Sequence, residues 1–153
     1  MIQQARTELL AIEKKAVLDL WNNEYPASLN YKDVDAFDEF LSKMGSPRHK
    51  LLFDKQLLAG WIVTFDRDGE RWFSIIVNSQ LQGKGIGKRL IELFKAEEEH
   101  LCGWVVDHED YIKLDGSPYN SPLTFYTKLG FELIEEERYK GDRLSAVKVY
   151  WEK

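Results

Sequence analysis

The sequence contains a single cysteine, Cys102, which excludes an intrachain disulfide and a metal site built from several cysteine ligands. Cys102 lies in the apolar run 101–106. This setting favours a thiol packed in the core over a catalytic nucleophile. Because the chain cannot form an internal disulfide, a reducing, cytoplasmic environment is the simplest expectation.

The chain also lacks a long apolar run and an excess of positive charge. A helix that spans a bilayer needs about 20 apolar residues, and no run in the sequence approaches that length. Charged side chains interrupt residues 1–20, so the sequence predicts neither a signal peptide nor a membrane partner. The net charge of −5 disfavours sequence-independent binding to nucleic acid.

Hydrophobic residues make up 44% of the 153 residues, which predicts one domain, spanning 1–153, with a sizeable core. Apolar side chains at helical spacing predict helices at 3–21 and 31–44. Three strands at 49–53, 57–65 and 71–77 follow, joined by tight turns, and form an antiparallel meander.

The second half of the chain alternates helices and strands. It predicts a helix over 86–99, a strand over 101–106, a polar loop over 107–120, a short helix that Ser121 precedes and Gly130 ends, and a hairpin of 131–138 with 144–151. This order predicts an α/β (α+β) fold with a mixed, mostly antiparallel sheet and helices on both faces.

A glycine-rich stretch at 82–88 joins the strand at 71–77 to the next helix. Its three alternate glycines leave peptide N–H groups uncovered, and a helix N-terminus carries about half a positive charge. Such a turn can hold a pyrophosphate or a similar anion, and Lys84 and Lys88 add positive charge. The stretch lacks the glycine spacing of a P-loop and the third glycine of a dinucleotide-binding fingerprint. It fits Q/R-x-x-G-x-G/A through Gln82, Gly85 and Gly87; a helix-initiating turn without a ligand is the alternative.

A second motif lies further along the chain, where Asn120 begins the run N-S-P-L-T-F-Y-T-K-L-G-F that ends at Phe131. A short helix carrying F-Y-x-K-L-G-F before a strand resembles the second signature of the Gcn5-related N-acetyltransferases (GNAT). The glycine-rich stretch resembles their acyl-coenzyme A loop. Both motifs stand in the family's order, and the element order matches too, so the resemblance covers nearly the whole chain.

The resemblance implies that the strands 71–77 and 101–106 splay apart, with the arm of acetyl-coenzyme A between them. The pantetheine amides then pair with the backbone of Ile75 and Val77, the diphosphate rests on the N–H groups around 83–88, and no metal is involved. Asn120 either contacts the coenzyme arm or caps the short helix. The residues implied in binding acetyl-coenzyme A are Ile75, Ile76, Val77, Gln82, Gly83, Lys84, Gly85, Ile86, Gly87, Lys88, Asn120 and Tyr126.

The resemblance also implies an N-acetyltransferase that moves an acetyl group to a primary amine by direct attack. Tyr126 is the expected general acid for the coenzyme A thiolate, because a phenol with a pKa of about 10 is uncharged at neutral pH and can donate its proton. The alternative is that Tyr126 only packs in the core. The backbone N–H of Val77 is the expected oxyanion donor. No general base stands out: Asp107 and His108 follow the strand 101–106, Glu24 is a further candidate, and a chain of water molecules is another route for the proton.

The acceptor is expected to be an amine on a small molecule or a protein. Acidic side chains at 107, 109 and 110 would favour a cationic amine if they line the site. Tyr25, Trp104 and Tyr111 are candidates for an aromatic wall, and the loop 107–120 is long enough to form a lid. A monomer and a homodimer are both compatible with the sequence. The alternative function is a non-catalytic acyl-coenzyme A-binding module of the same fold.

Overall fold

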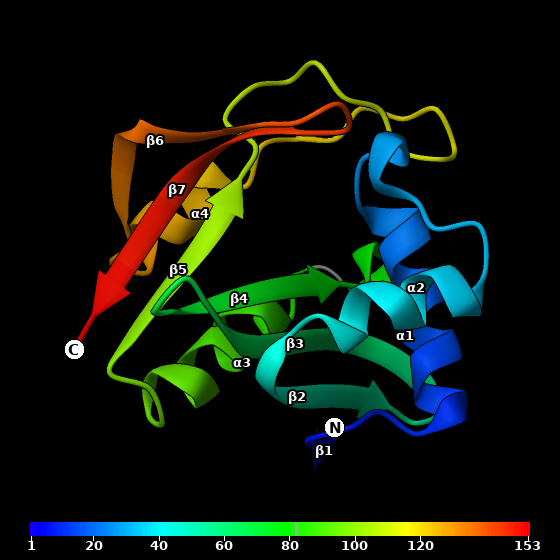
Figure 1. Ribbon diagram of the computed structural model, residues 1–153. Helices are drawn as coiled ribbons and strands as arrows, with labels where there is room; N and C mark the ends of the chain where they lie inside the picture. The colour runs from blue at the N-terminus through cyan, green and yellow to red at the C-terminus, as the bar shows by residue number, and fades with distance from the viewer. Residues whose placement is uncertain (82) are drawn as a thin grey trace.

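The computed structural model describes residues 1–81 and 83–153 and contains a seven-stranded sheet in the order β1-β2-β3-β4-β5-β7-β6 (Figure 1). Strands β4 and β5 are parallel, and the other five neighbouring pairs are antiparallel, so the predicted mixed sheet is confirmed. The strands are β1 (Ile2–Arg6), β2 (Gly45–Asp54), β3 (Leu57–Arg67), β4 (Glu70–Val77), β5 (His100–Val105), β6 (Glu132–Lys140) and β7 (Ser145–Glu152). The helices are α1 (Ala11–Glu24), α2 (Val34–Ser42), α3 (Ile86–Lys95) and α4 (Leu123–Lys128), with short 3-10 turns η1 (Ala27–Leu29) and η2 (Ser79–Leu81).

The N-terminal residues differ from the prediction of one helix over 3–21. Residues Ile2 to Arg6 form β1, which pairs antiparallel with β2, and α1 begins only at Ala11. The apolar side chains that gave the helical spacing all lie after Arg6, so nothing in the first residues opposes an edge strand. Glu13 fixes the start of α1, because its carboxylate accepts the N–H of Leu10 at 2.9 Å and pairs with Arg6.

Other boundaries shift by a few residues. Strand β2 begins at Gly45, at residues that were expected only to stop a helix, and α3 ends at Lys95 instead of continuing to 99. Strands β3 and β4 meet in a two-residue turn in which Asp68 and Gly69 have φ angles of 52° and 76°. Two successive positive φ angles match the twist of a tight antiparallel hairpin, so the predicted meander is confirmed.

Two hydrophobic cores lie on opposite faces of the sheet. The core under α3 and α4 contains Leu90, Phe94 and Tyr126. The core under α1 and α2 contains Val17 and Phe37. Helices therefore cover both faces, as predicted (Figure 1). No helix among the described residues has both the length and the apolar content needed to cross a bilayer.

The parallel strands β4 and β5 touch only near their beginning. Their pairing is registered at Trp72 and Cys102, and beyond that point the strands diverge (Figure 1). Close packing fixes the start of the gap: a Cβ atom on Gly103 would lie 2.7 Å from the ring of Phe73. The ring of His100 also accepts the backbone N–H of Arg71 at 2.9 Å. The sheet is therefore joined at one end of this strand pair and open at the other.

Candidate functional site

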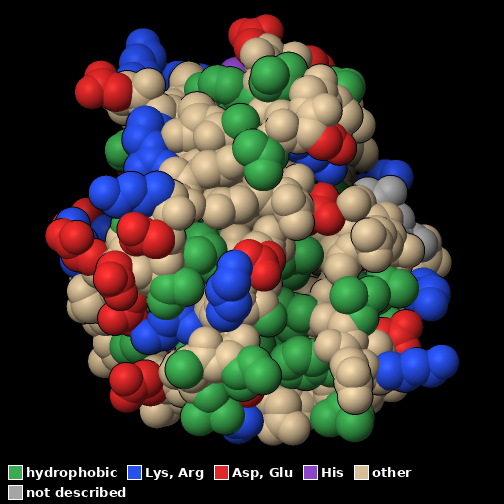
Figure 2. All heavy atoms as spheres, turned by 90° about the vertical axis from the view of Figure 1, so that its right-hand side faces the viewer, with side chains coloured by type: hydrophobic (Ala, Val, Ile, Leu, Met, Phe, Trp, Pro, Cys, Tyr) green, Lys and Arg blue, Asp and Glu red, His purple; other side chains and the backbone are tan. Residues whose placement is uncertain are grey.

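A cavity of about 930 Å³ occupies the gap between β4 and β5. Side chains from both cores line it, among them Ile75 and Tyr126 from the α3 side and Tyr25 and Phe65 from the α1 side. The cavity therefore passes through the sheet at the point where the strands separate. Figure 2 views the molecule from the side of α1 and α2, where hydrophobic side chains reach the surface between charged ones.

The glycine-rich loop forms one end of this cavity. Gly83 and Gly85 have φ angles of 83° and 70°, and a Cβ atom on either would meet no atom within 4 Å. Gly87 is needed for a different reason, because a Cβ there would lie 2.9 Å from the ring of Phe125. Two of the three glycines thus provide the left-handed turn and open space above it, and the third lets α3 approach α4.

The backbone N–H groups at the start of α3 point out of the helix without an intrahelical acceptor. Gly85 precedes the first turn, and the first helical hydrogen bond runs from the N–H of Arg89 to the carbonyl of Gly85 at 3.0 Å. The N–H groups of residues 86–88 are therefore available to an anion. Lys84 lies 3.7 Å from Asp54, and Lys88 lines the cavity. Gln82, also predicted to bind the coenzyme, lies outside the described residues.

The edge of β4 supplies backbone groups to the same cavity. The N–H of Asn78 bonds the carbonyl of Ala59 in β3 at 2.8 Å, so by strand alternation the peptide groups of Val77 and Ile75 face the gap. The carbonyl of Ile75 already accepts the hydroxyl of Tyr25 at 2.8 Å. The carbonyl of Ile75, which was expected to be free to pair with a pantetheine amide, thus already has a hydrogen-bond partner. Ile76 also lines the cavity, with its side chain in the core under α1.

Tyr126 lies on α4 with its ring among Phe73, Phe125 and Phe131. Its hydroxyl makes no hydrogen bond to any described residue, although the side chain lines the cavity. Burial raises the pKa of Tyr126, and burial also raises the pKa of the neighbouring Tyr119 to about 12. Both phenols are therefore protonated at neutral pH.

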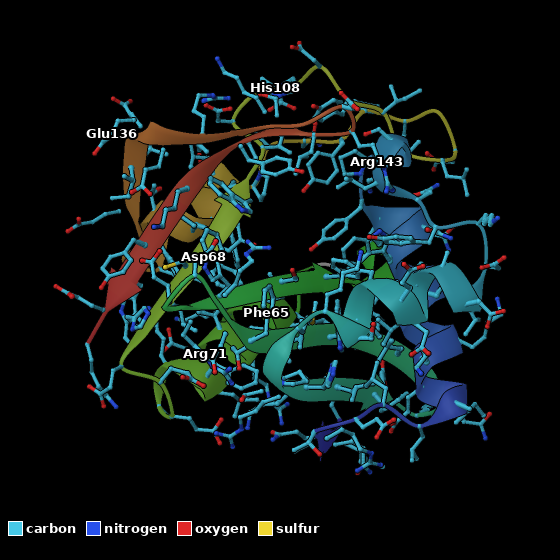
Figure 3. The ribbon with its side chains drawn as sticks, viewed as in Figure 1. Phe65, Asp68, Arg71, His108, Glu136 and Arg143 are labelled. Carbon is cyan, nitrogen blue, oxygen red and sulfur yellow. The ribbon has the colours of Figure 1, made fainter. Side chains whose placement is uncertain are left out.

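The residues considered as general bases are engaged elsewhere. Both carboxylate oxygens of Asp107 pair with Arg138, at 2.8 and 3.0 Å, and these bonds hold the pKa of Asp107 below its usual range. His108 contacts Tyr111 at the outer edge of the molecule (Figure 3). Neither residue is among those lining the cavity. Glu24 does line it, but its two oxygens accept the N–H of Ser79 at 2.8 Å and the ammonium of Lys113 at 3.1 Å.

The residues expected from the sequence to surround the amine acceptor are only partly found in the cavity. The acidic residues 107, 109 and 110 do not line the cavity, so they do not make it favourable to a cationic amine. Tyr25 and Trp104 do line it, whereas the hydroxyl of Tyr111 accepts the N–H of Ser145 outside it. Asn120 lines the cavity. The N-cap residue of α4 is Pro122, and the hydroxyl of Ser121 just before it accepts the N–H of Leu123 at 3.3 Å.

Sequence reasoning did not single out Lys113, Tyr119 or Arg67, which also line the cavity. The first two lie in the polar loop 107–120, whose path is set by contacts that no local pattern encodes. One of these is the hydrogen bond from the N–H of Ala27 to the carbonyl of Ile112 at 2.8 Å. Arg67 is the last residue of β3, and a charged residue beside a turn usually serves only to face the solvent.

Comparison with known proteins identifies this arrangement. Residues 49–133, more than half of the chain, match the family model described as acetyltransferase (GNAT) domain. No curated protein matches the sequence.

Solved structures with the same fold share little sequence with this chain. An aminoglycoside 6′-N-acetyltransferase complexed with coenzyme A has a TM-score of 0.74 at 15% identity, over 99% of this chain and 97% of that one. The aminoglycoside 6′-N-acetyltransferase of Enterococcus faecium has a TM-score of 0.70 at 16% identity, over 98% and 96%. An acyl-CoA N-acyltransferase of Pseudomonas aeruginosa has a TM-score of 0.69 at 17% identity, over 97% of each chain. At such identities these structures establish the fold alone. With the family model spanning most of the sheet and both motifs, the chain belongs to the GNAT acetyltransferase domain family.

Proposed function

We propose that the protein is an N-acetyltransferase that transfers an acetyl group from acetyl-coenzyme A to a primary amine by direct attack. One observation carries this proposal. One cavity joins the N–H groups at the start of α3 to the protonated hydroxyl of Tyr126, which bonds no described residue, and continues to the opposite face of the sheet. A coenzyme entering on one face and an amine on the other would meet at that hydroxyl.

The residues present fit acetyl-coenzyme A, which supplies the activated acetyl thioester. The N–H groups of residues 86–88 and the ammonium of Lys88 would hold the diphosphate, and the open space above Gly83 and Gly85 leaves room for it. The peptide groups of Ile75 and Val77 would hold the pantetheine arm as an added strand pairs with a sheet edge. The side chain of Asn120 lines the same cavity.

The chain's own groups supply the remaining chemistry. The N–H of Val77 faces the gap and would donate to a developing oxyanion. Tyr126 would give its proton to the departing thiolate. Because the carboxylate of Glu24 is held by Lys113 and Ser79, the proton of the amine is expected to leave through water in the open cavity.

The test is release of free thiol from acetyl-coenzyme A with a panel of amines. Tyr126→Phe should lower kcat by about 100-fold or more, the usual range for loss of a general acid, and leave the Kd for coenzyme A within about twofold. Tyr111→Phe removes a tyrosine hydroxyl outside the cavity and serves as the matched control. Equal kcat for Tyr126→Phe and the wild type would remove the acid role.

A non-catalytic acyl-coenzyme A-binding module is the second candidate function. It is favoured by the lining of the cavity, in which each described carboxylate has a cationic partner and no histidine is present. This alternative predicts binding without turnover. Coenzyme A at 100 times its Kd should then raise the free energy of unfolding by about 2.7 kcal/mol, while no amine releases thiol.

A further inference from the structure

The cavity is rich in positive charge although the protein is acidic overall. Its lining includes five cationic side chains, Lys43, Arg67, Lys88, Lys113 and Arg143, and two anionic ones, Glu24 and Asp66. Both anionic side chains are already paired, Glu24 with Lys113 and Asp66 with Arg71. The lining therefore offers a substrate unpaired positive charge and no unpaired carboxylate from the described residues.

Arg67 stands out among these cations. Its guanidinium lies 4.4 Å from the centre of the Trp72 ring and 5.5 Å from that of Phe65, and no carboxylate of the described residues lies within salt-bridge distance. Arg67 as a whole is exposed to solvent, and partial burial of its guanidinium lowers the pKa of Arg67. Arg143 differs, because its guanidinium donates to the carbonyls of Ser28 and Asn30.

The surroundings of Arg67 are aromatic. The indole of Trp104 lies 5.0 Å from that of Trp72 and 5.8 Å from the ring of Tyr139. Phe65 and Trp104 belong to the core under α1 and α2, on the face opposite the glycine-rich loop. Figure 3 shows Phe65 at the sheet and Arg143 near the upper end of α1, beside the β6–β7 hairpin. An acceptor entering from this face would pass aromatic side chains and the guanidinium of Arg67 that lies against them.

Arg67 and the expected reacting position line the same cavity. Val77, whose N–H is the expected oxyanion donor, and Trp72, beneath Arg67, both belong to β4 and are five residues apart. A group bound by Arg67 would therefore lie nearer the start of β4 than the amine that is acetylated.

We propose that the acceptor is a primary amine on an apolar or aromatic body that ends in a carboxylate, and that Arg67 binds this carboxylate. The inference rests on the proposed function and names the substrate class of the same site. A polycationic acceptor such as an aminoglycoside or a polyamine would find no unpaired carboxylate in the described lining and would meet Lys43, Arg67 and Arg143 instead. A tripeptide with an aromatic middle residue has this chemistry, because it carries its amine at one end and its carboxylate at the other.

The probe is the tripeptide Ala-Phe-Ala as the free acid and as the C-terminal amide, with spermidine as the polycation. Calorimetry with coenzyme A-loaded protein measures binding, and thiol release measures kcat/KM. The free acid should bind about tenfold more tightly than the amide, because a guanidinium–carboxylate hydrogen bond is lost in the amide. Arg67→Gln should reduce this preference to less than about twofold, and Arg67→Lys should retain part of it.

Arg48→Gln is the matched control, because Arg48 is exposed on β2, pairs with Glu97 and lies outside the cavity. Equal binding of acid and amide by the wild type, an unchanged preference in Arg67→Gln, or spermidine as the best acceptor would each overturn the inference. If amines release thiol without any preference for the acid, the inference fails and the acetyltransferase stands. If the acid binds with the predicted preference but no amine releases thiol, the carboxylate site stands and the transferase proposal fails.

Discussion

At the scale of single residues, the hydroxyl of Tyr25 occupies a backbone carbonyl that a pantetheine arm would use. It donates to Ile75 at 2.8 Å across the open side of β4. Burial raises the pKa of Tyr25, so the hydroxyl keeps its proton and the bond persists through the physiological pH range. In the proposed binding mode, the pantetheine arm must therefore displace or share this hydrogen bond.

The variant Tyr25→Phe frees the carbonyl of Ile75 in advance. We expect its Kd for coenzyme A to fall by about fivefold, since a typical hydrogen bond contributes about 1 kcal/mol net. Isothermal titration calorimetry with Tyr111→Phe as the control measures the effect. An unchanged or weaker affinity would show that the coenzyme does not compete for this carbonyl.

His49 makes stability depend on pH. The ring is buried in β2, where its Nδ1 accepts the indole N–H of Trp61 at 3.1 Å, and burial lowers the pKa of His49 to about 4. In the unfolded chain the imidazole titrates near its ordinary pKa of about 6.5, so as pH falls the unfolded state takes up the proton first. The contribution of His49 is therefore fully present above pH 6.5 and is lost between pH 6.5 and 4.

Urea unfolding at pH 7 and pH 5 tests this. The free energy of unfolding of the wild type should fall by about 2 kcal/mol more between these pH values than that of His49→Asn. Asparagine offers an oxygen to Trp61 in place of Nδ1 but does not titrate. Equal losses in the two proteins would mean that the ring is already protonated in the folded state or reached by water.

At the scale of elements, the turn before α3 allows coenzyme binding and folding to be tested separately. A side chain on Gly85 meets open space but must adopt a left-handed φ angle, at a cost of about 1 kcal/mol or slightly more. The same side chain would cover the N–H groups of residues 86–88. Gly85→Val should therefore fold, with a slightly lower Tm, and bind coenzyme A at least about 100-fold more weakly.

Gly69→Val is the control for backbone strain, because Gly69 has a φ angle of 76° and equally open surroundings in the β3–β4 turn. The two variants should lose similar thermal stability by circular dichroism. Only the loop variant should lose binding by calorimetry. Coenzyme affinity within about threefold of the wild type in Gly85→Val would place the diphosphate elsewhere.

Elements with strong local signals were predictable, and elements set by distant contacts were not. The glycine-rich turn and the short helix of Tyr126 carry their signals in a few adjacent residues. Strand β1 has no such signal, because an edge strand is defined by its pairing with β2. The ion-pair partner of Asp107 could not be predicted from local sequence either. Arg138 follows Asp107 by 31 positions and reaches it only because β6 folds back toward the end of β5. The sequence therefore supported a coenzyme loop and a tyrosine but gave no reliable base.

At the scale of the whole molecule, contacts between the end of α1 with η1 and the C-terminal half of the chain close a ring around the cavity. Figure 1 shows the β6–β7 hairpin and the loop 107–120 reaching across toward the end of α1. The hairpin is attached by Arg143, whose Nε donates to the carbonyl of Ser28 at 2.7 Å. The loop is attached by the bond between Ala27 and Ile112 and by the pairing of Lys113 with Glu24. This face of the cavity is thus bounded by polar contacts instead of a hydrophobic core.

Such a closure should open locally without unfolding the sheet, because its bonds are few and lie near solvent. Arg143→Gln removes the guanidinium that bonds Ser28 and Asn30. We expect the amides of η1 to exchange hydrogen about fivefold faster in this variant, while those of α3 keep their wild-type rates. Lys140→Gln removes an exposed charge on the same hairpin and should change neither set. Unchanged exchange in η1 after loss of Arg143 would mean that the loop 107–120 holds the ring closed by itself, and faster exchange in α3 as well would mean that the closure supports the global fold.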